Sequence, residues 1–117
     1  MPASSTGDPA SSFVHLHVHT EYSMLDGAAR IDDLFTEAAH QGSPALATTD
    51  HGYIFGAYEF WKAGRKHGVK PIIGLEAYLT PGTHRTDRTR VKWGAGGRDD
   101  VSGSGAYTHM TLLARDN

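Results

Sequence analysis

Histidines at alternate positions near the start of the chain are the first residues that indicate chemistry. His15, His17 and His19 lie within the run Phe-Val-His-Leu-His-Val-His. In an extended backbone, residues two positions apart point to the same side and lie roughly 7 Å apart. Imidazole nitrogens arranged in this way can converge on a metal ion. The alternative is a polar strand face, or a chance cluster of histidines.

Further potential ligands lie at or near the ends of later apolar runs. Asp26 precedes a glycine, His51 follows Asp50 after an apolar run, and Glu76 and His109 lie within two later runs. Asp26 by itself is typical of a turn, Asp50 could cap a helix, and a lone strand histidine such as His109 is more often a satisfied core residue. Glu76 is harder to explain in this way, because a carboxylate inside an apolar run is costly to bury without a partner. We expect it to face the rim of the sheet or a cation.

This set of donors is suited to particular metals and to a particular reaction. The chain contains no cysteine, so imidazole and carboxylate groups are its only strong ligands for a divalent ion. Such a mixture suits zinc, manganese or iron, and this number of donors can hold more than one ion. Metal ions about 3.5–4 Å apart favour phosphoester hydrolysis, because they activate water and stabilise the attacking and leaving oxygens.

Alternating strands and helices are predicted to position these residues. Apolar patterns predict strands at 13–17, 44–49, 71–79 and 107–114, a helix from Ile31 to a stop at Gly42, and a helix at 55–67 that stops at Gly68. The positions predicted to face the core are Ile31, Leu34, Phe35, Ala38 and Ala39 in the first helix, and Phe55, Ala57, Phe60, Trp61 and Gly64 in the second. This order indicates an α/β fold with parallel strands, in which the carboxyl ends of the strands meet on one rim.

The rest of the chain suggests one partial domain. Residues 1–12 are rich in Ser, Pro and Gly and are expected to form a disordered tail, and 13–117 form the domain. Residues 82–106 have no apolar period and are predicted to be a long basic, Gly-rich loop. The last residues fall where a crossover helix is expected, so we expect the amino-terminal portion of a larger fold, apparently truncated.

The overall composition excludes some classes of protein. Eleven Lys and Arg nearly balance thirteen Asp and Glu, so net charge directs the chain neither toward nor away from nucleic acid. No stretch reaches the roughly 20 apolar residues of a membrane span, and the start does not resemble a signal peptide. We therefore expect a cytoplasmic protein without membrane contact.

Four long motifs in order resemble one known family. The segments 14–27, 45–52, 68–78 and 107–114 are similar to the polymerase and histidinol phosphatase (PHP) superfamily. Their form most resembles the PHP domain of the bacterial DNA polymerase III alpha subunit, DnaE type. The resemblance implies part of a distorted (β/α)7 barrel with a trinuclear metal site. Carried over, the metal ligands are His17, His19, Asp26, His51, Glu76 and His109, whereas His15 is not among them.

The resemblance also implies a function. The full-length protein is expected to replicate DNA as a DNA-directed DNA polymerase, with metal-dependent 3′–5′ exonuclease proofreading in which Asp26 and His51 are catalytic. Zinc or manganese would occupy the PHP site, and magnesium a polymerase site outside this chain. Primer-template DNA and replisome subunits such as the sliding clamp are the expected partners. Relatives supply further ligands from later strands, so the fragment alone is expected to be inactive.

Two alternatives remain at this point: a free-standing phosphatase of the histidinol-phosphate type, and a non-catalytic scaffold stabilised by metals.

The basic loop is also open to two interpretations. Arg85, Arg88, Arg90 and Lys92 are suited to contact DNA phosphates, and a solvated charged loop is the other reading.

Overall fold

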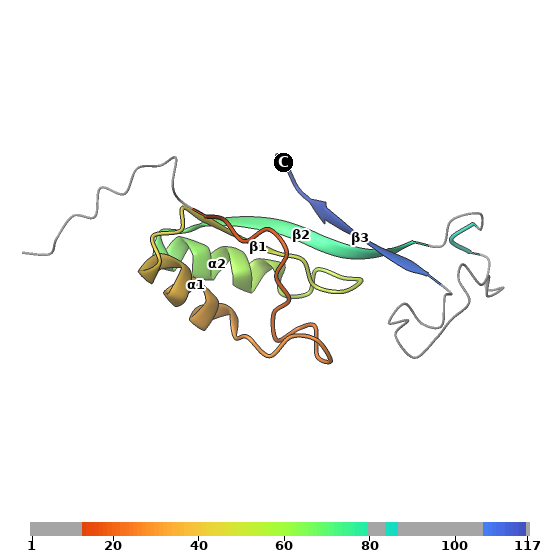
Figure 1. Cartoon of the computed structure of the whole chain (residues 1–117), viewed down its shortest axis with the longest axis horizontal. Helices are drawn as coiled ribbons and strands as arrows, with labels where there is room; N and C mark the ends of the chain where they lie inside the picture. The colour runs from red at the N-terminus through yellow and green to blue at the C-terminus, as the bar shows by residue number, and fades with distance from the viewer. Residues whose placement is uncertain (1–12, 80–83, 87–106, 117) are drawn as a thin grey trace, which may run out of the picture.

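Helices and strands alternate in a small α/β structure. The computed structural model describes residues 13–79, 84–86 and 107–116. Its elements are α1 (Ile31–His40), β1 (Ala45–Thr48), α2 (Ala57–His67), β2 (Lys70–Leu79) and β3 (Thr108–Leu113). Within this part of the chain the strands form one sheet in the order β1-β2-β3, and both helices lie on the same side of it (Figure 1).

A compact apolar cluster joins the helices to the sheet. The rings of Phe35 from α1 and Phe60 from α2 have centroids 4.6 Å apart, and both side chains are fully buried. Leu46 of β1 and Val69, which precedes β2, belong to the same cluster. Burying large apolar side chains in this way contributes about 1.5–3 kcal/mol each, so these contacts fix the helices against the strands that carry the polar residues.

Strand β2 pairs with different neighbours along its two halves. Lys70 to Ile73 pair with β1 in parallel, and Gly74 to Leu79 pair with β3 antiparallel. The sheet is therefore mixed, and the prediction of parallel strands throughout is wrong for β3. Antiparallel neighbours need no helical crossover between them, and the long stretch before β3 carries no helical apolar pattern.

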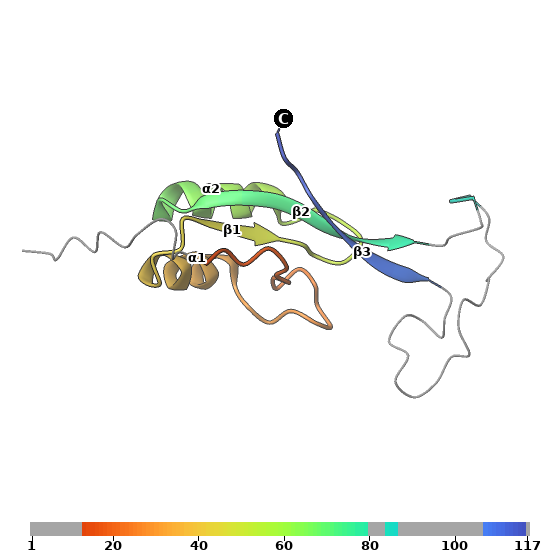
Figure 2. The same ribbon diagram turned by 45° about the horizontal axis from the view of Figure 1, so that its top comes forward.

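The predicted first strand at 13–17 is also wrong in extent. Only His15 makes a bridge, in parallel with Leu46 of β1. The backbone continues alongside β1 (Figure 2), where Ala47 N donates to His15 O at 3.0 Å and Thr49 N donates to Val18 O at 2.8 Å. The hydroxyl of Thr49 accepts from Val18 N at 2.9 Å, and this side-chain contact replaces one bond of a regular ladder.

The other predicted elements are present, but some of the residues that were predicted to face the core are exposed. Helix α1 buries Ile31, Phe35 and Ala38 as predicted, whereas Ala39 is exposed. Helix α2 starts two residues later than predicted, at Ala57, and ends before Gly68, which has a left-handed backbone. Phe55 precedes the helix and is exposed, and Trp61 is 47% exposed, because the buried stripe follows Phe60, Ala63 and Gly64.

Neither helix in the described part of the chain has the length and apolar character needed to cross a bilayer. The predicted tail at 1–12 lies outside the described residues, as does the predicted loop at 82–106 apart from residues 84–86.

Candidate metal centre

Six side chains converge at the edge of the sheet where β1 ends and β2 continues. They form three overlapping groups, and within each group the potential ligand atoms lie within 4.8 Å of one another. The groups are His17, His19 and Glu76; His19, Asp26 and His51; and His51, Glu76 and His109. All six residues proposed from the sequence are therefore brought together, from four separate stretches of the chain.

Glu76 lies at the centre of this arrangement. Its side chain comes from β2 and is only 8% exposed. The Nε2 atoms of His17 and His19 each donate to Oε2 at 2.6 Å, and Nδ1 of His109 donates to Oε1 at 2.7 Å. Burial by itself raises the pKa of this carboxyl, but the three hydrogen bonds and the charge of nearby His51 outweigh it and lower the pKa to about 2. Glu76 is therefore an anion at neutral pH.

His51 and Asp26 form the outer part of the centre. His51 follows β1 and makes a parallel bridge with Glu76, and its Nε2 lies 2.9 Å from Oδ2 of Asp26. Its Nδ1 atom is buried and has no hydrogen-bond partner among the described residues, although Oε1 of Glu76 lies 3.9 Å away. A buried imidazole nitrogen without a partner is costly, and a metal ion would satisfy it.

The local backbone explains which histidines take part. His17 and His19 alternate along the stretch beside β1 and so reach the same carboxylate. His15 bridges to β1 instead, and its ring packs against Phe13 with centroids 4.8 Å apart. It belongs to none of the three groups.

Asp50 is a structural residue whose role the sequence did not reveal. It is 3% exposed, and its Oδ1 accepts from Thr20 N and Ser23 Oγ, both at 2.7 Å. Its Oδ2 accepts from the hydroxyls of Thr20 at 2.8 Å and Thr48 at 3.1 Å. The carboxylate therefore ties the loop that carries Asp26 to the end of β1. The three hydroxyl residues around it are the sequence signal that could have indicated a buried acceptor.

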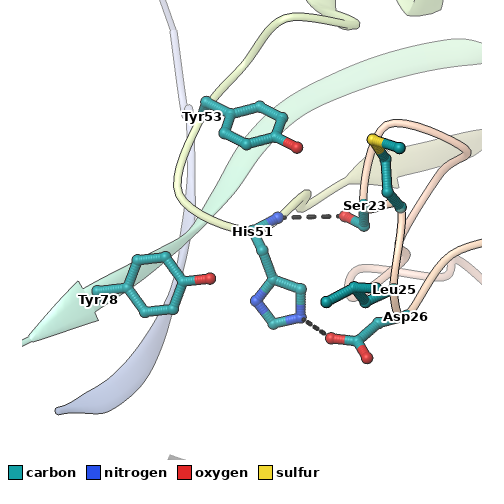
Figure 3. A pocket seen from close by; sticks show the side chains of 7 residues that line it. Ser23, Leu25, Asp26, His51, Tyr53 and Tyr78 are labelled. Atoms are coloured by element: carbon teal, nitrogen blue, oxygen red, sulfur yellow. Dashed lines mark hydrogen bonds and ion pairs between the residues drawn. The ribbon is translucent and has the colours of Figure 1, made fainter. Parts of the chain in front are cut away.

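A pocket opens beside the outer part of the centre (Figure 3). It has a volume of about 270 Å³ and is lined by Ser23, Met24, Leu25, Asp26, His51, Tyr53 and Tyr78. His51 lies between Tyr78 on one side and Leu25 with Asp26 on the other. Two of the candidate metal ligands, Asp26 and His51, are therefore accessible from a defined cavity.

The chemistry of the donors fits divalent metal ions. Four imidazoles and two carboxylates are present without thiolates, which is the mixture that zinc, manganese and iron accept. The unpartnered Nδ1 of His51 and the buried, ionised Glu76 both match the requirements of a cation site. Of the proposed DNA contacts, Arg85 is exposed in the short described segment 84–86, and Arg88, Arg90 and Lys92 lie outside the described residues.

Comparisons with known sequences place this geometry in context. The PHP domain family model matches residues 15–117. The DNA polymerase III subunit alpha of Mycobacterium tuberculosis is 55% identical, over 99% of this chain and 10% of that protein. The same subunit of Saccharopolyspora erythraea is 56% identical over 92% of this chain, and that of Deinococcus radiodurans is 46% identical over 99%. The chain spans about a tenth of the length of these curated relatives.

Solved structures share the fold over part of the chain. A Bifidobacterium adolescentis protein described as a metal-dependent phosphoesterase aligns with a TM-score of 0.54 and 26% identity, over 59% of this chain and 23% of that one. An amidohydrolase from Chromobacterium violaceum, with bound sulfate, aligns with a TM-score of 0.53 and 31% identity, over 61% and 24%. The similarity covers about a quarter of each of these proteins.

Proposed function

The chain belongs to the PHP domain family, and from this premise we propose that it forms part of a metal-dependent 3′–5′ exonuclease site in a bacterial DNA polymerase III alpha subunit. The substrate is the 3′ end of a DNA strand, and the bond broken is the phosphodiester before a mispaired terminal nucleotide. The names of the curated relatives support the polymerase setting over a free-standing histidinol-phosphate-type phosphatase. In this setting the chain contributes the amino-terminal part of a distorted (β/α)7 barrel.

The observation that carries the proposal is the convergence of four imidazoles around one buried carboxylate, with Asp26 beside the outermost imidazole. Three imidazoles contact Glu76 directly, and a fourth, His51, lies beside it with a nitrogen that has no hydrogen-bond partner in the described part of the chain. A purely structural role for Glu76 would need one partner for its charge, whereas this arrangement gathers more imidazoles than the charge requires. A site that holds several cations explains the excess.

We assign the ligands by the groups in which they lie. Glu76 and its histidine partners would hold zinc or manganese at the inner positions, and Asp26 with His51 the outer one, within a trinuclear cluster in the complete domain. Bound divalent ions activate the attacking water and stabilise charge on the phosphate oxygens. The carboxylate of Asp26 is 58% exposed and its Oδ2 lies 2.9 Å from Nε2 of His51, so this pair is placed to accept the proton that the water releases.

The whole protein extends this proposal beyond the chain. We propose that it is a DNA-directed DNA polymerase of the bacterial cytoplasm, with a magnesium-dependent polymerase site outside these residues. Primer-template DNA and replisome subunits such as the sliding clamp are its partners. The exposed Arg85, with Arg88, Arg90 and Lys92 further along, would contact phosphates of the bound strand.

The full-length protein, loaded with zinc or manganese, tests the exonuclease assignment. It should shorten a primer with a mismatched 3′ end, and Asp26→Asn should reduce this rate by about 10²-fold or more, in the range typical of a lost acid–base group. Asp33→Asn, which removes an exposed carboxylate from α1, is the matched control and should leave the rate unchanged. Metal content measured by mass spectrometry shows whether the variants still bind ions.

Three other outcomes would distinguish the alternatives. Cleavage of small phosphomonoesters without cleavage of DNA would support the phosphatase. Full metal occupancy with neither activity would support the scaffold. Absence of bound metal in the wild-type protein would contradict the proposal, because every step of it requires a metal ion.

A further inference from the structure

Two apolar side chains at the tip of the loop before Gly27 are left exposed beside the candidate metal centre. Met24 is 85% exposed and Leu25 is 98% exposed, although the neighbouring residues of the loop, Thr20 and Ser23, are buried and hydrogen-bonded. Packing does not explain these side chains, because they contribute almost nothing to the core. They line the pocket that contains Asp26 and His51.

The aromatic walls of this pocket are held in place. The hydroxyl of Tyr53 donates to Tyr22 O at 2.6 Å, and its ring stacks on Phe55 with centroids 4.4 Å apart. The ring of Tyr78 lies against Gly52, where an added Cβ would be 2.7 Å from the ring carbon Cε2. Because both rings are fixed before a ligand arrives, little conformational entropy is lost when one binds.

Polarity is distributed unevenly within the pocket. The two candidate metal ligands of the pocket, Asp26 and His51, contact each other, with His51 lying between Tyr78 and Leu25 (Figure 3), and the remaining lining side chains are apolar, aromatic or hydroxyl-bearing. The hydroxyl of Ser23 is already engaged, since it donates to Asp50 at 2.7 Å and accepts from His51 N at 3.2 Å. A ligand here meets apolar and aromatic side chains directly beside the metal-binding groups.

We propose that this pocket holds the terminal nucleobase at the 3′ end of a DNA strand, in contact with the rings of Tyr53 and Tyr78 and with the side chains of Met24 and Leu25. The inference rests on the proposed exonuclease function and defines where its substrate binds. The base contacts the apolar and aromatic side chains, and the phosphodiester reaches Asp26 and His51. A cavity of about 270 Å³ is slightly smaller than typical small-molecule sites of about 300–1,000 Å³, so it suits one nucleoside rather than several.

The same lining explains how a mispaired end would be selected. Aromatic and apolar walls stack on any base, and the pocket's one hydroxyl outside the tyrosines is already bonded within the loop. The four bases should therefore bind comparably. Selection then comes from the lower cost of unpairing and unstacking a mismatched terminal base.

Binding of a single-stranded oligonucleotide to the full-length, zinc-loaded protein tests this pocket. The probe carries 2-aminopurine at its 3′ end and a phosphorothioate at the last linkage, which slows cleavage. Stacking should quench its fluorescence, whereas a probe with 2-aminopurine five or more positions from the end should be unchanged. The double variant Met24→Ser/Leu25→Ser and the variant Tyr78→Leu should abolish the quenching and weaken binding about 5- to 100-fold, as expected for the loss of stacking on one base.

Matched controls separate stacking from loss of fold. Tyr78→Phe keeps the ring and should retain the quenching, and Tyr58→Leu, on the exposed face of α2, should behave as the wild type. An abasic 3′ terminus should bind the wild-type protein as weakly as the pocket variants bind an intact end. Equal quenching and affinity in the wild type and in both sets of pocket variants would overturn the inference.

Failure of the pocket and failure of the proposed function give different results. If the wild-type protein shortens DNA and the pocket variants do so with unchanged KM and rate, only the pocket assignment is wrong. If the metal-loaded wild-type protein neither binds 3′ ends nor shortens DNA, the exonuclease proposal is wrong and the pocket assignment falls with it.

Discussion

Replacing Asp50 with asparagine should loosen the loop that carries Asp26, although Asp50 itself contacts none of the candidate metal ligands through its side chain. Its two carboxylate oxygens accept four hydrogen bonds, and every partner is a donor. Asparagine keeps the size but replaces one oxygen with an NH₂ group. If the amide oxygen continues to accept from Thr20 N and Ser23, the NH₂ group faces the hydroxyls of Thr20 and Thr48.

The size of the effect follows from those two contacts. A hydrogen bond to a charged group contributes about 1.5–3 kcal/mol, and Asp50→Asn removes two of them. The hydroxyls can rotate to accept from the NH₂ group, but that of Thr20 already accepts from Tyr22 N at 3.2 Å. Allowing for partial recovery, we expect a loss of about 2–4 kcal/mol in the local stability of the loop.

Hydrogen exchange of the peptide covering residues 18–27 measures this loss in the intact protein. A change of about 2–4 kcal/mol corresponds to exchange roughly 30- to 1,000-fold faster, provided that the amides exchange through local opening. Metal affinity should fall as well, because Ser23 also accepts from His51 N. Asp33→Asn is the control for the loss of one negative charge. If exchange in Asp50→Asn stays within threefold of the wild type, the reasoning about the buried carboxylate is wrong.

Three further predictions concern other parts of the structure. Gly27→Ala should destabilise the loop by at least about 1–3 kcal/mol, because an added Cβ would lie 2.0 Å from Thr20 O; a lowered urea midpoint would show it, and an unchanged midpoint would contradict the close approach. Hydrogen bonds from Lys66 and His67 lower the pKa of Asp32, so its contribution to stability is present above the ordinary value of 3.8 and is lost as the pH falls through the lowered pKa; acid unfolding of Asp32→Asn should lack this small component. Zinc at 100 times its Kd should stabilise the fold by about 2.7 kcal/mol; a raised urea midpoint would show it, a chelator should reverse it, and an unchanged midpoint in excess zinc would contradict a metal site around Glu76.

The proximity of His51 and Glu76 could be predicted because it depends on strand order. An imidazole or carboxylate that follows an apolar run lies at the end of a strand, and strand ends meet when the strands share a sheet. His51 and Glu76 come together in this way through the parallel pairing of β1 with β2. Their role as metal ligands stays a proposal, but their proximity follows from the sequence pattern.

Other features depend on contacts between distant residues and could not be predicted in the same way. The direction of β3 depends on its pairing with β2, and an apolar run has the same pattern in either direction. The stretch at 13–17 alternates like a strand, but the hydroxyl of Thr49 bonds to Val18 and interrupts the ladder. The exposure of Trp61 depends on where α2 meets the sheet, which its own spacing does not fix.

Because β2 pairs with a different strand along each half, insertions and deletions within β2 should disturb the site much more than side-chain substitutions do. Successive residues of a strand point to opposite faces, and Glu76 is held in register with His51 on one edge and with Thr111 on the other. Substitutions near the site should change its affinity for metal gradually. Inserting or deleting a single residue between Ile73 and Glu76 would turn the carboxylate away from all four imidazoles in one step, so lineages that keep a working centre should tolerate no indels in this segment.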